Sequence, residues 1–162
     1  MRKRRKLRGF TLVEIMVVVT LIGFLAMLSV PVFKRIKLRA LSATFTADTR
    51  LFSEAFQRYA QQNGSFPDTA GVATIPTGMD EYIDLNDWSK TTSLGGNYRW
   101  LNIPSADAQR GQYEIGVVQV VGATVSLEEM ELIDTWIDDG NVATGNVIVS
   151  GAGSVVFFIV EI

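Results

Sequence analysis

The sequence predicts an α+β protein in which a long helix near the N-terminus carries a small antiparallel sheet. Three observations support this fold class. Residues 10–33 form an apolar run in which Glu14 is the only ionisable side chain. Apolar residues at helical spacing continue this segment to about residue 62. Residues 63–162 contain short runs rich in valine, isoleucine and aromatic residues, separated by glycine-containing turns, which is typical of strands.

The run at residues 10–33 is long enough to cross a membrane as one helix. A rise of about 1.5 Å per residue lets it span a hydrocarbon core of about 30 Å. Residues 1–9 carry six Lys or Arg and no acid. An ordinary secretory signal has its small-residue cleavage site after the apolar core, whereas here the small residue, Gly9, precedes the run. Cleavage after Gly9 would remove the basic leader and keep the membrane helix.

The helix is expected to run from about residue 11 to residue 62. Pro31 lies inside it, which membrane helices tolerate better than soluble ones do. Gly64 and Pro67 provide the stop. We therefore divide the chain into a leader (1–9), a transmembrane half-helix (10–33), an amphipathic half-helix (34–62) and a globular head (63–162). One apolar stripe of the second half-helix is expected to pack against the head; it consists of Leu38, Leu41, Phe45, Phe52, Ala55, Phe56 and Tyr59.

The head is predicted to begin with a loop at residues 68–92. A short helical turn should anchor this loop to the core through Met79, Tyr82, Ile83 and Trp88. Further along the chain, Ser126 and Glu129 have the spacing of a capping box that opens a helix. The apolar face expected for that helix consists of Leu127, Met130, Ile133 and Ile137.

Four strands are predicted, at residues 97–103, 112–121, 147–150 and 154–162, with turns at 104–111 and 151–153. The last strand is apolar on both faces at residues 155–160, so we expect other structure to cover both sides of it. The three tryptophans, Trp88, Trp100 and Trp136, are expected in the core.

Composition excludes several classes of function. The chain has no cysteine and no histidine, which rules out disulfides, cysteine nucleophiles, histidine-based triads and zinc held by these residues. Residues 34–39 carry four Lys or Arg, and residues 40–162 carry five basic against 16 acidic groups. An acidic head would repel phosphate, so nucleic-acid binding is not expected. The basic leader favours a cytoplasmic N-terminus, and residues 34–39 can lie among the headgroups of the outer leaflet.

The GFTLVE segment at residues 9–14 resembles, position for position, the cleavage and methylation motif of type IV pilins and type II secretion pseudopilins. The resemblance extends more loosely to Pro31 and to residues 63–67, so it covers about the first 67 residues. It implies that a membrane-bound prepilin peptidase cuts after Gly9 and that Phe10 is then N-methylated. It further implies assembly with other pilin or pseudopilin subunits, in a homo- or hetero-filament, on an inner-membrane platform, with the head in the periplasm.

Glu14 is the residue to which the resemblance gives a role in assembly, as partner of the N-terminal amine of a neighbouring subunit. A carboxylate near the middle of a membrane helix costs about 2.5–3.5 kcal/mol, and less near one end, so some compensation is expected. The freed amine of Phe10, in the same or a neighbouring chain, is the nearest cation. Alternatively, Glu14 reaches the membrane interface and only favours the positive end of the helix dipole.

Acidic residues at the end of the predicted helix in the head offer oxygen ligands of the kind that Ca²⁺ accepts: Asp134, Asp138, Asp139 and Asn141. Gly140 would permit the sharp turn between them. Major pseudopilins are loosely similar, since many hold calcium in a C-terminal loop, although the spacing here departs from their pattern. A plain Asp-Gly turn is the alternative. We expect no other cofactor.

Three functions remain open on this sequence. The first is a structural subunit without catalytic activity, assembled into a type II secretion pseudopilus or a type IV pilus-like filament. The second is an uncleaved bitopic membrane protein whose acidic head binds a ligand or protein, or carries an unrecognised activity. The third is a module that recognises secreted cargo through its head. The sequence favours the first, because the motif at residues 9–14 accounts for both the leader and the helix.

Overall fold

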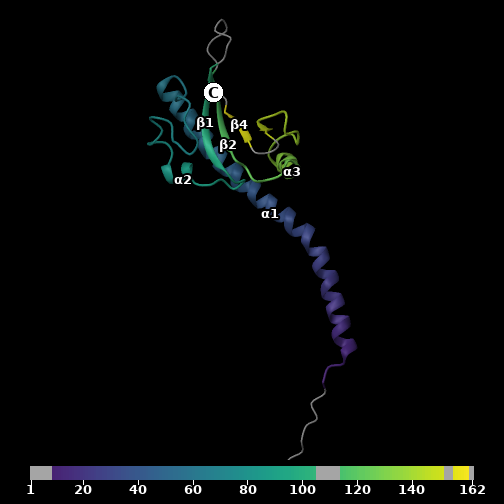
Figure 1. Cartoon of the computed structure of the whole chain (residues 1–162). Helices are drawn as coiled ribbons and strands as arrows, with labels where there is room; N and C mark the ends of the chain where they lie inside the picture. Colours follow the sequence, from purple (N-terminus) through teal and green to yellow (C-terminus); the bar gives the residue numbers. More distant parts are fainter. Residues whose placement is uncertain (1–8, 105–113, 152–154, 161–162) are drawn as a thin grey trace, which may run out of the picture. The chain divides into compact units, whose positions relative to one another are not determined.

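The computed structural model describes residues 9–104, 114–151 and 155–160 (Figure 1). The leader at residues 1–8 and most of the two turns expected at 104–111 and 151–153 lie outside these residues. The chain forms two compact units, Met1–Lys37 and Leu38–Ile162. The first unit contains the apolar part of the long helix. The second contains the remainder of that helix and the head.

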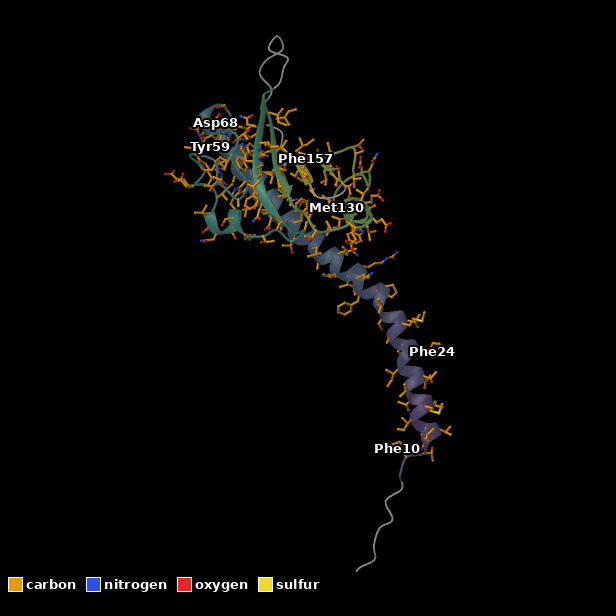
Figure 2. All side chains as sticks on the ribbon, viewed as in Figure 1. Phe10, Phe24, Tyr59, Asp68, Met130 and Phe157 are labelled. Atoms are coloured by element: carbon orange, nitrogen blue, oxygen red, sulfur yellow. The ribbon has the colours of Figure 1, made fainter. Side chains whose placement is uncertain are left out.

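The long helix, α1 (Leu12–Asn63), has 52 residues and confirms the expected bounds. It runs through Pro31. Within the first unit its large apolar side chains are exposed, as Figure 2 shows for Phe24, which is 64% exposed. Gly64 ends the helix with φ at 81°, and its N–H donates to the carbonyl of Ala60 at 2.7 Å. The glycine stop predicted from the sequence is therefore confirmed.

The second half of α1 supplies one wall of the core of the head. The stripe predicted from the sequence is buried, although Leu41 and Tyr59 are only partly covered. It also includes two hydroxyl residues, Ser42 and Thr49. The Thr49 hydroxyl donates to the carbonyl of Phe45 at 2.9 Å, which satisfies its polar group inside the core. Phe56 stacks on Trp100 with ring centroids 3.6 Å apart.

The sheet has four antiparallel strands in the order β1-β2-β4-β3. These are β1 (Asn97–Pro104), β2 (Glu114–Val121), β3 (Val147–Ser150) and β4 (Val155–Val160), close to the predicted ranges. Figure 1 shows β4 beside β2. Val156 and Val160 of β4 are buried, and its other described side chains are partly covered. The central position of β4 explains why a strand with no polar face is stable there.

A short helix, α2 (Leu85–Ser89), anchors the loop that precedes the sheet, as predicted. The Asp84 side chain caps it by accepting from the N–H of Asn86 at 2.7 Å. Trp88 is fully buried, and its indole N–H donates to the carbonyl of Thr74 at 2.9 Å. The expected anchoring residues Met79 and Ile83 are buried as well.

The third helix, α3 (Leu127–Ile137), begins with the predicted capping box between Ser126 and Glu129. Two expectations on this helix are wrong. Leu127 is 42% exposed, because the buried side centres on Met130, Ile133 and Asp134 and leaves the first turn at its edge. Trp136 is 38% exposed rather than in the core, because at 100° per residue it lies about 110° around α3 from the centre of that face. The Arg39 guanidinium lies 6.0 Å from its ring centroid.

Candidate functional site

The N-terminal end of α1 holds the residues of the predicted cleavage motif. Gly9 and Phe10 precede the first turn of the helix, and Phe10 is 82% exposed (Figure 2). A Cβ built on Gly9 would meet no atom within 4 Å. The Gly9–Phe10 peptide bond therefore lies outside regular structure and is open to solvent among the described residues. A protease needs both properties, since it must bind the backbone around the bond that it cuts.

A capping box that the sequence analysis missed opens α1. The N–H of Thr11 donates to the Glu14 carboxylate at 2.9 Å, and the N–H of Glu14 donates to the Thr11 hydroxyl at 3.2 Å. The same hydroxyl donates to the carboxylate at 3.0 Å. Thr11 and Glu14 have the spacing S/T-x-x-E, the signal that identified the box at Ser126. This box begins the helix two residues after the Gly9–Phe10 bond.

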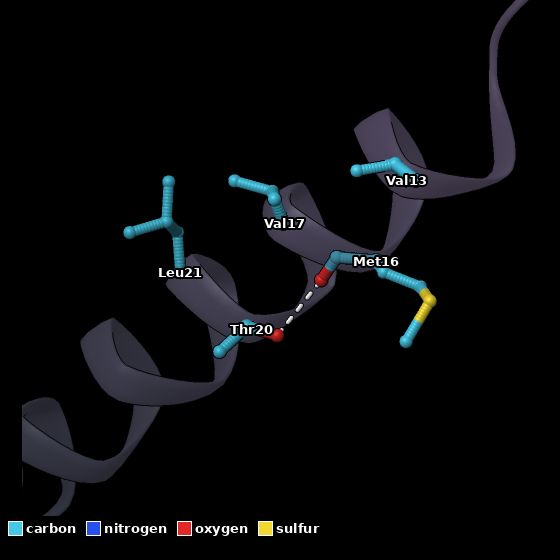
Figure 3. A pocket seen from close by; sticks show the side chains of 5 residues that line it. All are labelled: Val13, Met16, Val17, Thr20 and Leu21. Atoms are coloured by element: carbon cyan, nitrogen blue, oxygen red, sulfur yellow. Dashed lines mark hydrogen bonds between the residues drawn. The ribbon is translucent and has the colours of Figure 1, made fainter.

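An apolar surface follows the capping box along α1, and all of its lining residues belong to this helix. Val13, Val17 and Leu21 follow one another along the helix and form a shallow apolar groove with Met16 and Thr20 (Figure 3). The Thr20 hydroxyl donates to the carbonyl of Met16 at 2.8 Å, and Ser29 does the same to Leu25 at 2.8 Å. Both hydroxyls are satisfied inside the helix, as an apolar environment requires. Among the described residues, α1 is the one helix long and apolar enough to cross a membrane, by length and composition.

The acidic cluster of the head brings together the three predicted carboxylates. Oxygens of Asp134, Asp138 and Asp139 lie within 4.8 Å of one another. Asn141 closes a local turn beside them: its side-chain oxygen accepts from the N–H of Ala143 at 3.2 Å. The three carboxylates come from the last turn of α3 and the residues that follow it.

Asp138 and Asp139 are fixed by the loop that leads to β3. The Asp138 carboxylate accepts from the N–H groups of Asn146 and Val147. The Asp139 carboxylate accepts from the Thr144 hydroxyl at 2.7 Å and from the N–H of Asn141 at 2.8 Å. These two bonds lower the pKa of Asp139. Hydrogen bonds from the loop thus fix the positions of both carboxylates.

Asp134 differs from its two neighbours. It is fully buried, and neither of its carboxylate oxygens accepts a hydrogen bond of ordinary geometry among the described residues, although the Gly140 N–H and the Asp139 carboxylate lie close enough to act on its charge. Burial raises the pKa of Asp134, and the charges of Asp138 and Asp139 raise it further. A buried carboxylate beside two other carboxylates is unfavourable by itself, so this arrangement suits a cation or a proton. The sequence located the cluster but could not predict this burial.

The fold and the N-terminal site define the class of protein: a pilin-like α+β architecture with a long apolar helix near the N-terminus that fits a membrane anchor. Residues 4–30 match the family of the prokaryotic N-terminal methylation motif, which is the signature of type IV pilins and pseudopilins. No curated protein and no solved structure matches the chain. The motif supports a prepilin-like subunit that is processed by a prepilin peptidase, and proteins with this signature are structural rather than enzymatic.

Proposed function

We propose that this protein is a structural subunit cleaved after Gly9, N-methylated on Phe10 and assembled through α1 into a type II secretion pseudopilus or a type IV pilus-like filament. The exposed Gly9–Phe10 bond directly before a capped apolar helix is the observation that carries this proposal. Cleavage there would leave the capping box and the whole helix intact. The head stays in the periplasm, and the inner membrane holds α1 before assembly on an inner-membrane platform.

The apolar half of α1 supports assembly through helix packing. Its large apolar side chains are exposed in the single chain, from Leu12 to Ile36. Lipid covers such a surface before assembly, and the helices of other subunits can replace the lipid in a filament. Pro31 lies within this surface, and we include it among the residues that pack between subunits.

Glu14 is proposed to pair with the methylated amine of Phe10 in a neighbouring subunit. Its carboxylate already accepts two hydrogen bonds from Thr11. An ionised carboxylate has about four acceptor positions, so the capping box leaves capacity for an ammonium group.

The proposal is tested by the intact mass and N-terminal sequence of the protein purified from its native membranes. We expect a chain that begins at Phe10 and carries the extra mass of one methyl group. The variant Gly9→Val should keep Met1, because the peptidase would no longer accept the residue before the cut. Gly23→Ala is the matched control, since a Cβ at Gly23 also meets open space but lies inside α1. A wild-type chain that still begins at Met1 would favour an uncleaved bitopic protein.

We also propose that Asp134, Asp138 and Asp139 bind Ca²⁺. The burial of Asp134 within 4.8 Å of two other carboxylates supports this ligand over a plain Asp-Gly turn, because a turn needs no buried carboxylate. Gly145 is part of the same arrangement: it has φ at 79°, and a Cβ there would collide with the Asp138 carboxylate.

Thermal unfolding of the full chain in detergent tests this site. Ca²⁺ should raise the melting temperature by about 5 °C or more relative to chelator, since a ligand that binds only the folded state stabilises it. Asp134→Asn should abolish the shift, and Asp68→Asn, at an exposed acid outside the cluster, should retain it. Equal melting temperatures with Ca²⁺ and with chelator would contradict calcium binding and leave the turn as the explanation.

A further inference from the structure

A second surface of the head lies along the part of α1 that belongs to the second unit. It is an open groove, which we call the arginine groove, lined by Arg39, Ser42, Ala43, Thr46, Ala47, Arg50 and Trp136. The exposed alanines form a small apolar floor between the two arginines. Trp136 of α3 forms one wall and lies against Arg39. The groove thus combines an apolar floor, an exposed aromatic ring and two cationic ends.

The two arginines of this groove have no acidic partner. Arg39 contacts the Trp136 ring, but among the described residues no carboxylate forms an ion pair with Arg39 or Arg50. By contrast, Lys90 pairs with Asp48 at 3.3 Å, and the Arg99 side chain donates to the carbonyl of Ala70 at 3.3 Å. Residues 39–162 carry 16 acidic and six basic groups, so two arginines left without an acid in one groove indicate that their partner lies outside the chain.

The head carries a matching acidic surface elsewhere, which we call the acidic turn (residues 80–85). Asp80 and Glu81 are exposed, and neither forms a hydrogen bond or an ion pair among the described residues. The same segment exposes Leu85 to 57%. It therefore offers what the groove lacks: two free carboxylates and one apolar side chain that fits an alanine floor.

We propose that the arginine groove of one subunit binds the acidic turn of a second copy of this chain. The inference rests on the proposed function as a filament subunit and adds a contact between heads. Because the two surfaces differ, the contact is heterologous and leaves a free groove at one end and a free turn at the other. Contacts of this kind extend into open helical assemblies when the rotation between subunits does not close a ring.

The spacing of the charges favours a protein segment over a lipid headgroup. Arg39 and Arg50 are eleven residues apart on one helix, which corresponds to about 16 Å along the axis. A single phosphate cannot reach both ends. A protein segment can place a carboxylate at one arginine and an apolar side chain on the alanine floor between the two arginines, as Glu81 and Leu85 of the acidic turn would.

Cysteine cross-linking in native membranes tests the contact, because the chain has no cysteine of its own. The full-length double variant Ala47→Cys, Leu85→Cys should form a ladder of dimers, trimers and higher species under oxidation. Each single variant should remain monomeric. A dimer formed by Ala47→Cys alone would show a symmetric contact and overturn the proposal. If oxidation of the double variant gives only monomers, the proposal is overturned too, and an anionic lipid or another acidic protein becomes the candidate ligand of the groove.

Charge reversal tests whether Arg50 of the groove pairs with Glu81 of the acidic turn. Arg50→Glu in the double-cysteine background should reduce the ladder at least tenfold, and adding Glu81→Arg should restore at least half of it. Arg58→Glu is the matched control, because Arg58 is exposed on the same helix but outside the groove. A ladder that Arg50→Glu leaves unchanged would contradict the role of the groove.

The N-terminal mass of the same sample separates this proposal from the proposed function. A chain that begins at Phe10 but forms no ladder overturns the groove contact alone. A chain that begins at Met1 and forms no ladder overturns both.

Discussion

At the scale of single residues, Asp48 connects α1 to the sheet. Its carboxylate accepts from the Tyr98 hydroxyl at 3.1 Å and pairs with Lys90 at 3.3 Å. Tyr98 is fully buried, and its ring packs edge-on against Phe52 at 4.8 Å. Burial raises the pKa of Tyr98 above its ordinary value of 10, and the neighbouring Asp48 raises it further. The hydrogen bond therefore depends on a tyrosine that stays protonated.

This contact makes the head sensitive to alkaline conditions. Tyr98 keeps its proton in the folded state and loses it more readily in the unfolded state, so its stabilising contribution is complete below pH 10 and is lost as the pH rises above it. Tyr98→Phe should lower the free energy of unfolding at pH 7 by about 1.5–3 kcal/mol and weaken the alkaline loss. Denaturant unfolding at pH 7 and above pH 10 measures both. Tyr82→Phe is the control, and an alkaline loss unchanged in Tyr98→Phe would contradict this role.

Sequence reasoning reached some residues and missed others for identifiable reasons. It located Gly9, Phe10 and the acidic cluster because these depend on local order and spacing. Asp48 is not part of the apolar stripe predicted for α1, yet its side chain is 14% exposed and bonded to the sheet. A partner fifty residues away, such as Tyr98, is a product of the tertiary fold and leaves no local signal.

At the scale of elements, the first turn of α1 gives Glu14 two separable roles. The carboxylate caps its own helix through Thr11, and we propose that its charge pairs with the amine of a neighbour. Glutamine can replace glutamate in a capping box, because its side-chain oxygen accepts the same backbone hydrogen bond. It cannot supply the negative charge. The two roles can therefore be measured independently.

We predict that Glu14→Leu inserts into the membrane as well as the wild type or better, because the cost of a buried carboxylate disappears, but fails to assemble. Glu14→Gln should retain the cap and still impair assembly, since the ammonium loses its counter-charge. The yield of sheared filaments, relative to the amount of subunit in the membrane, measures assembly. Normal assembly of Glu14→Gln would assign Glu14 to capping only, and normal assembly of Glu14→Leu would exclude both roles.

At the scale of the whole molecule, element types followed from the sequence, but their arrangement did not. Hydrophobic periodicity predicted α1 and α3, and the four strands fell close to their predicted ranges. The order β1-β2-β4-β3 was not predictable, because strand pairing depends on contacts between distant segments. The exposure of Trp136 was missed for a related reason. Its size favoured the core, but its position on α3 placed it in the arginine groove.

The central position of β4 has a consequence for biogenesis. Residues 155–160 follow the other three strands along the chain, yet they pair with both β2 and β3. Until they are in place, β2 lacks one neighbour and β3 lacks its partner in the sheet. An unpaired strand edge of this kind is a site for non-native association. Pairing of β4 is thus the event that completes the sheet, and a chain in which β4 has not yet paired would expose two strand edges that can associate with other chains.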